Sequence, residues 1–186
     1  MGQKLSGWLH SVSRGWVALT ALVIFVLFTA LVLPGQNAQM DVYGADAGSP
    51  DLSLTYSTVD LYAMAEAYGP QGRVEYVRAR LTFDVIWPVV YTVFLVTAIS
   101  WLTRRAFAAD SLWQRANLIP LVAALFDYLE NTTTSLVMAR YPARTPVVDT
   151  LATLFTPLKW LFIVAGFVLL LICAGVNVWR QFRRTS

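Results

Sequence analysis

The chain has 186 residues, of which 57% are hydrophobic and only 13% are charged. A soluble domain carries about 25% charged residues, so this composition argues against a water-soluble protein and indicates one domain within a lipid bilayer. The formal net charge of +3 does not indicate a nucleic-acid partner, because the basic residues collect at the ends of apolar segments. Cys173 is the one cysteine and His10 the one histidine, which excludes an intramolecular disulfide and the usual histidine or cysteine metal sites. We therefore expect no metal site and no cofactor.

Four apolar segments are long enough to cross about 30 Å of hydrocarbon as helices. The first begins at Trp16 and has no charged residue before Pro34-Gly35. Its basic N-terminal flank is typical of a signal peptide, but no small-residue cleavage site follows convincingly, so we interpret it as an uncleaved anchor. The sequence predicts an all-α integral membrane protein with a four-helix transmembrane bundle, forming a single membrane domain over residues 1–186. The predicted spans are about 16–34, 82–103, 117–139 and 150–179.

The basic residues predict how these spans are oriented. Most of them fall on one side of a four-span arrangement: Lys4, Arg14, Arg104, Arg105, Arg115, Arg180, Arg183 and Arg184. The opposite side has Arg140 and Arg144 in a short loop, and a long loop that is rich in acids near its start. The positive-inside rule then predicts that both termini are cytoplasmic. We expect the plasma membrane, or the inner membrane if the source is bacterial.

The long loop, about 35–81, exceeds an ordinary connector and should have structure of its own. Its first part, through Pro50, is polar and glycine-containing, and we expect it to be irregular. Ser57 followed by Asp60 is typical of a helix start, and Gly69-Pro70 should end that helix. Such an amphipathic helix would lie on the outer membrane surface or cap the bundle.

Ionised residues lie inside the predicted spans, where each charge costs roughly 2.5 kcal/mol or more and normally faces a bundle interior. From Gly72 onward the chain is predicted to be one helix entering the second span, with Arg80 and Asp84 forming an i,i+4 pair. Three polar stripes result, one on each of the last three spans. The first is Arg73, Val77, Arg80, Asp84, Trp87 and Tyr91, the second is Asp127, Glu130, Asn131 and Thr134, and the third is Thr153, Thr156 and Lys159.

The depths of these residues can be compared by counting along the helices. Glu130 and Lys159 each lie about nine residues, or roughly 14 Å, below the outer helix ends, so we expect them to pair. Asp84 should lie nearer the outer mouth, and Asp127 one turn deeper. The carboxylates outnumber the cations at this depth, so at least one should be protonated or hold a cation. The long loop would cover the cluster.

Three hypotheses for function follow. The leading one is a pocket for a lipid or other amphiphile in the outer half of the bundle, bound by Arg80, Asp84, Trp87, Tyr91, Asp127, Glu130, Asn131, Lys159 and Trp160. The second is an intramembrane enzyme acting on a lipid or isoprenoid, with Asp127 or Glu130 as the catalytic acid/base or in Mg²⁺-assisted chemistry. The third is a structural or accessory subunit, as a homo-oligomer or with a membrane partner, in which the ion pairs fix helix register. Ion or proton passage through the cluster is a further alternative. No motif resembles a known family closely enough to carry residues over.

Overall fold

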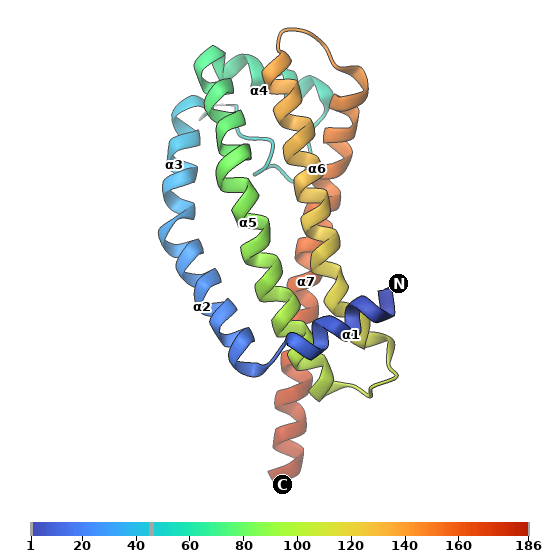
Figure 1. Cartoon of the computed structure of the whole chain (residues 1–186). Coiled ribbons are helices and arrows are strands. Elements are labelled where there is room, and N and C mark those ends of the chain that lie inside the picture. The colour runs from blue at the N-terminus through green and yellow to red at the C-terminus, as the bar shows by residue number, and fades with distance from the viewer. Residues whose placement is uncertain (1, 45–46, 186) are drawn as a thin grey trace. The chain divides into compact units, whose positions relative to one another are not determined.

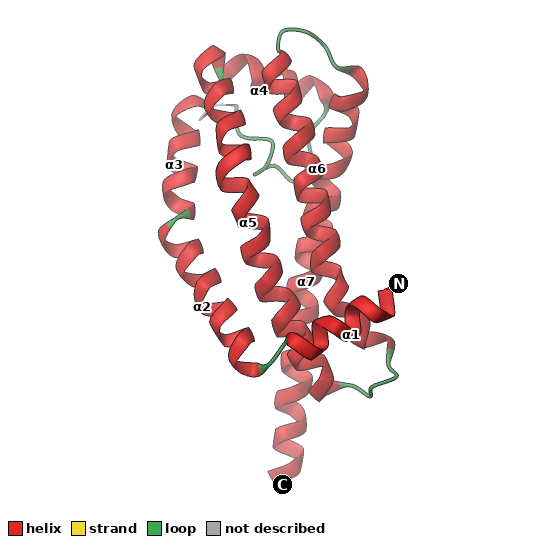
Figure 2. Cartoon of the chain, viewed as in Figure 1, coloured by secondary structure: helices red, strands yellow, loops and turns green. Residues whose placement is uncertain are grey.

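The computed structural model describes residues 2–44 and 47–185, and every regular element in these ranges is helical (Figures 1 and 2). The elements in chain order are α1 (Gly2–Val12), α2 (Gly15–Leu31), α3 (Leu33–Gly44), α4 (Thr58–Ala67), α5 (Gly69–Ala106), the 3-10 helix η1 (Leu112–Leu118), α6 (Ile119–Arg140) and α7 (Pro146–Thr185). The predicted all-α class is confirmed. The longest helices, α5 and α7, have 38 and 40 residues.

Within the described residues, three stretches of helix are long and apolar enough to cross a membrane, namely Gly15–Gln36, Gly69–Ala106 and Pro146–Arg183. These stretches are compatible with a membrane protein. The helix α6 is not one of the three, because a run of charged and polar residues in its second half lowers its hydropathy. Its 22 residues nevertheless extend over about 33 Å.

Two parts of the N-terminal third differ from the prediction. Residues 2–12 form a separate helix, α1, where the sequence suggested only the basic flank of an anchor. The predicted break at Pro34-Gly35 was wrong, because α2 ends at Leu31 and α3 begins two residues later. The loop start that we expected to be irregular through Pro50 is helical up to Gly44, whereas residues 47–50 are irregular as predicted. Pro34 falls in the first turn of α3, where the missing proline N–H has no intrahelical partner to lose, so proline starts this helix instead of ending one.

The chain divides into two compact units. Unit 1 consists of Met1–Val26, Val90–Ala123 and Leu161–Ser186, and unit 2 consists of Leu27–Val89 and Ala124–Trp160. The two units differ in charge. Unit 1 has eight lysines and arginines and one acidic residue, whereas unit 2 has six lysines and arginines and ten acidic residues. Unit 1 is therefore strongly basic and unit 2 is acidic.

Helix α4 begins and ends where the sequence predicts. Ser57 is its N-cap, and the Ser57 hydroxyl accepts a hydrogen bond from the backbone N–H of Asp60 while the Asp60 carboxylate accepts one from the Ser57 backbone. The hydrogen bonds that the exposed Asp60 carboxylate accepts from the Ser57 backbone N–H and the Ser57 hydroxyl hold its pKa below the ordinary value. Gly69 ends the helical path with φ of 61°, a left-handed conformation that favours glycine, and α5 starts from it.

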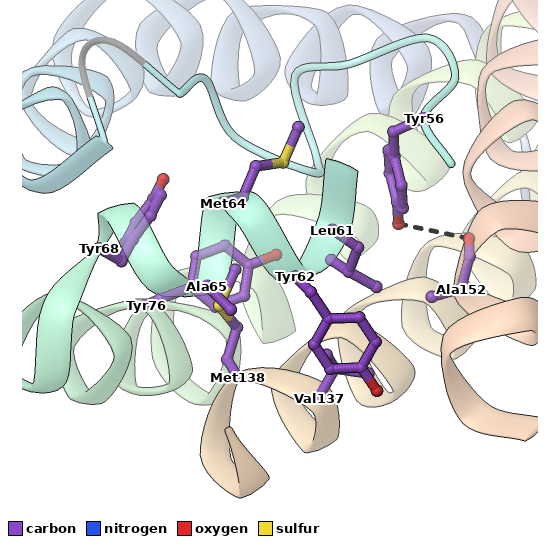
Figure 3. Packing of buried hydrophobic residues seen from close by; sticks show 10 residues of the cluster. All are labelled: Tyr56, Leu61, Tyr62, Met64, Ala65, Tyr68, Tyr76, Val137, Met138 and Ala152. Atoms are coloured by element: carbon purple, nitrogen blue, oxygen red, sulfur yellow. Dashed lines mark hydrogen bonds between the residues drawn. The ribbon is translucent and has the colours of Figure 1, made fainter. Parts of the chain in front are cut away.

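The hydrophobic core of unit 2 forms where α4 packs on α5, α6 and α7 (Figure 3). Leu61 and Ala65 of α4 are fully buried, against Tyr76 of α5 and Val137 of α6. Burying a leucine side chain contributes roughly 1.5–3 kcal/mol. The Tyr62 hydroxyl also accepts a hydrogen bond from the backbone N–H of Thr145 (2.7 Å), which ties α4 to the loop before α7. Helix α4 is thus fixed over the ends of three helices.

Unit 1 is organised around the second half of α5. Leu95 and Ile99 are fully buried there, and Phe25 of α2 stacks on Phe94 with ring centroids 4.9 Å apart. Gly166 of α7 allows close approach, since a side chain at that position would meet Leu95 at 3.2 Å.

Candidate functional site

Helix α5 presents Arg80 and Asp84 on one buried face of unit 2. The Arg80 Nε and Asp84 Oδ2 atoms lie 2.9 Å apart, in the i,i+4 pair that the helical spacing predicts. The two side chains are 5% and 7% exposed. Asp84 is therefore enclosed by the folded chain, and its position near the outer end of the bundle stays a prediction. The Arg80 guanidinium also lies over the Tyr76 ring, 4.6 Å from its centroid, which is a cation–π arrangement.

The connecting segment 47–57 contributes Asp51, a residue that the sequence analysis did not assign to the site. Arg80 Nη1 donates to Asp51 Oδ1 at 2.5 Å, so one guanidinium holds two carboxylates. Burial alone would raise the pKa of the Asp51 carboxyl, but the nearby Arg80 and Lys159 charges and hydrogen bonds from Ser49 and Arg80 hold the pKa below its ordinary value. Asp51 is therefore ionised at neutral pH.

Glu130 of α6 and Lys159 of α7 form the second ion pair, as the depth count predicts. Glu130 is fully buried, and the Lys159 side chain is 5% exposed. Lys159 Nζ also donates to the backbone carbonyl of Asp51 at 3.1 Å. The segment 47–57 therefore joins the two ion pairs, through the Asp51 side chain on Arg80 and the Asp51 carbonyl on Lys159.

A chain of hydroxyl groups ends on Glu130. The Thr156 hydroxyl lies 2.7 Å from Glu130 Oε1 and 2.9 Å from the Tyr56 hydroxyl. The Thr156 hydroxyl donates to Glu130 Oε1, and the Tyr56 hydroxyl donates to the backbone carbonyl of Ala152 at 3.3 Å. Burial and the Glu130 and Asp51 charges raise the pKa of Tyr56, which keeps its phenol protonated as a donor.

Asp127 and Asn131 lie one turn apart on α6 and are both buried. Asn131 Nδ2 donates to Asp127 Oδ1 at 3.0 Å, which fixes the orientation of the amide because a carboxylate oxygen cannot donate. The amide oxygen of Asn131 and the hydroxyl of Ser135 have no hydrogen-bond partner among the described residues. Buried polar atoms usually have one, so these two can accept a partner from a bound molecule.

The three aromatic residues proposed for the site, Trp87, Tyr91 and Trp160, have different surroundings in the structure. The Trp160 indole N–H donates to the carbonyl of Ser53 at 2.9 Å, and its ring centroid lies 5.1 Å from Lys159 Nζ. Trp87 stacks on Phe28 with centroids 5.7 Å apart, so it belongs to an aromatic group of unit 2. Tyr91 is buried in unit 1 and is not part of the unit 2 cluster described here.

A groove runs along α5 and α6 beside these charges. One cavity of about 390 Å³ is lined mainly by apolar side chains, including Leu81, Val85 and Leu136, together with Arg80, Asn131 and Ser135. A second cavity of about 370 Å³ includes Arg73 and Tyr141. The two share Val77 and Ala139 in their walls, so they adjoin. The groove thus combines apolar walls with a buried cation and two unsatisfied polar atoms.

Among the described residues, no three or more histidine, cysteine, aspartate or glutamate side chains are grouped as metal ligands. Comparison with known proteins gives no match for this chain, either to a protein-family model, to a curated protein or to a solved structure.

Proposed function

We propose that this chain is a multi-pass membrane protein with four spans and both termini in the cytoplasm. The separation of charge supports the orientation, because basic residues concentrate in unit 1 and the positive-inside rule assigns such regions to the cytoplasm.

The burial pattern of α6 supports a fourth span. Its polar residues Asp127, Glu130 and Thr134 are buried, while Leu125 and Leu136 are exposed. A helix with its charges inward and leucines outward suits lipid surroundings. The membrane we propose is the plasma membrane, or the inner membrane of a bacterium.

In this arrangement unit 2 binds a lipid or another amphiphile in the α5–α6 groove. The observation that carries the proposal is the composition of the groove, whose apolar walls adjoin the Arg80 guanidinium and two oxygens, of Asn131 and Ser135, that have no hydrogen-bond partner in residues 2–44 and 47–185. Ligand sites typically combine apolar walls with a few placed polar groups. The apolar part of the ligand would lie along Leu81 and Val85, and its polar group would meet the three polar residues.

A structural role for the ion pairs is the second candidate, and the contacts of Glu130 favour it over acid/base catalysis. Glu130 is already engaged by Lys159 and Thr156, and Lys159 also holds the segment 47–57. On this view the pairs fix α6, α7 and the covering segment together, and the ligand occupies the groove beside them. A role as an enzyme acting on a lipid or isoprenoid would instead need Asp127 or Glu130 to reach the substrate.

Filling the groove tests the proposal. Ala139 lines both cavities and is exposed, so Ala139→Trp should occupy the groove without removing a hydrogen bond. We expect mass spectrometry of the purified protein to find less co-purifying lipid in this variant. Leu125→Trp is the matched control, because Leu125 is an exposed residue of α6 that lines neither cavity. Equal lipid content in both variants, at unchanged thermal stability, would refute a ligand site in the groove.

A further inference from the structure

A further cavity, with a different chemistry from the two in unit 2, lies in unit 1 between α1, the end of α5 and η1. Its volume is about 530 Å³, and its lining includes two arginines, Arg104 and Arg115, against one acid, Asp110, together with His10. Gly7, Phe107 and Leu112 supply apolar lining. Because the cations outnumber the anions and no ion pair involves these arginines in the described residues, the cavity carries uncompensated positive charge.

The walls of this cavity are fixed by hydrogen bonds. The Ser6 hydroxyl of α1 lies 2.8 Å from the Asn117 side-chain oxygen, and Asn117 Nδ2 donates to the Ser100 hydroxyl at 2.9 Å. The side-chain amide of Gln114 donates to the carbonyl of Thr103, in the last turn of α5, and to those of Phe107 and Ala108 just beyond the helix. The cavity is therefore formed before any ligand binds, which lowers the entropic cost of binding.

His10 lies between two backbone carbonyls in the cavity wall. Its Nδ1 lies 3.1 Å from the carbonyl oxygen of Ser100 and its Nε2 lies 2.8 Å from that of Gln114. These two contacts hold the ring in the wall of the cavity.

The surroundings of the cavity are those of a membrane interface. Helix α1 exposes an apolar stripe, with Leu5, Trp8 and Val12 exposed by 43%, 59% and 44%. Leu112, at the edge of the cavity, is 75% exposed. Amphipathic helices with apolar and tryptophan residues on one side and basic residues nearby lie in the interface between headgroups and acyl chains.

We infer that the unit 1 cavity binds the phosphate of an anionic phospholipid headgroup, in the leaflet that the apolar stripe of α1 contacts. Arg104 and Arg115 supply the charge-assisted hydrogen bonds to the phosphate oxygens. Arg104 already donates to the Ser13 carbonyl through Nη2 at 2.6 Å, and a guanidinium has further N–H groups that can donate to a ligand. In the proposed orientation this is the cytoplasmic leaflet, where anionic lipids create a negative surface potential. This proposal does not depend on the amphiphile site proposed in unit 2, because the two sites share no residue.

Native mass spectrometry of the full chain, titrated with phosphatidylglycerol or phosphatidylcholine, tests the inference. Replacing Arg104 and Arg115 together by glutamine should weaken phosphatidylglycerol binding roughly 150-fold, the factor that follows from about 1.5 kcal/mol for each hydrogen bond to a charged group. The control replaces Arg180 and Arg183, which lie in the same unit but outside the cavity, by glutamine. We expect the control to lose less than about threefold. Phosphatidylcholine binding should be unchanged in both. Equal losses in the two double variants would mean diffuse attraction and would overturn the site.

Replacing Arg104 also removes its hydrogen bond to the Ser13 carbonyl, which can affect folding. A second variant therefore tests the site without changing either arginine. Ala109 is exposed and lines the cavity, so Ala109→Glu adds a negative charge there without removing a contact. It should weaken phosphatidylglycerol binding, whereas Ala109→Gln, of the same size, should not. Equal binding by both Ala109 variants would contradict the inference. Displacement of phosphatidylglycerol by equimolar glycerol phosphate would also overturn the assignment to a lipid, since a soluble phosphate ester would then suffice.

Discussion

The Glu130–Lys159 pair gives the sharpest test of how unit 2 is held together. Lys159→Met removes the cation and leaves a fully buried carboxylate with Thr156 as its remaining hydrogen-bond donor among the described residues. Breaking one partner of a buried pair typically costs about 3–5 kcal/mol. The same change removes the hydrogen bond from Lys159 to the Asp51 carbonyl, which adds about 1 kcal/mol. We therefore expect Lys159→Met to lose about 4–6 kcal/mol of stability.

Removing both charges, with Glu130→Gln and Lys159→Met, should recover most of this loss, because no buried charge is then left without its partner. The bond to Asp51 stays broken, so about 1 kcal/mol should not be recovered. Unfolding in mixed detergent micelles measures the two single variants and the double variant as one cycle. Arg78→Met is the control: it breaks a pair with Glu75 at 3.5 Å in which Arg78 is 72% exposed, and should cost less than about 1 kcal/mol. Additive losses in the double variant would show that the two charges do not stabilise each other.

Two further predictions concern the covering segment and the orientation. Because the folded-state pKa of Asp51 is below its ordinary value of 3.8, the stability that Asp51 contributes is complete above pH 3.8 and is lost as the pH falls through the lowered pKa. The difference in melting temperature between wild type and Asp51→Asn should therefore shrink in acid below pH 3.8, and a constant difference would argue against the Arg80 contact. For the orientation, Val59→Cys and Leu112→Cys in a Cys173→Ala background both present exposed positions. A membrane-impermeant maleimide should label position 59 alone in intact cells, and labelling at position 112 would reverse the proposed topology.

Much of the secondary structure could be predicted because its causes are local. Ser57 and Asp60 start α4 through hydrogen bonds that reach only three residues along the chain. Arg80 and Asp84 meet because residues four apart lie on one face of any helix. The depth count for Glu130 and Lys159 succeeded for a related reason, since the regular rise of a helix converts residue number into height.

The errors occurred where local signals conflict or where burial depends on distant parts of the chain. Pro34 was interpreted as a helix end, although proline is equally compatible with a first turn, and the following polar residues carry no apolar period that would reveal α3. Helix α1 is held by contacts of Ser6 and His10 with residues about a hundred positions away. The sequence of residues 2–12 alone could not predict those contacts.

From the sequence alone, the composition and the apolar periods determined an all-α protein with helices able to cross a membrane, and helical spacing determined which polar side chains share a face. Only the tertiary structure decided which of these faces meet and what completes the cluster. Asp51 lies 29 residues from Arg80 and 108 from Lys159 in the chain, yet its side chain and its carbonyl join the two ion pairs. The physical reason is that the charge on a buried arginine or lysine requires a partner without specifying which one. That choice depends on how the segment 47–57 packs on α5 and α7, and packing is a property of the whole chain.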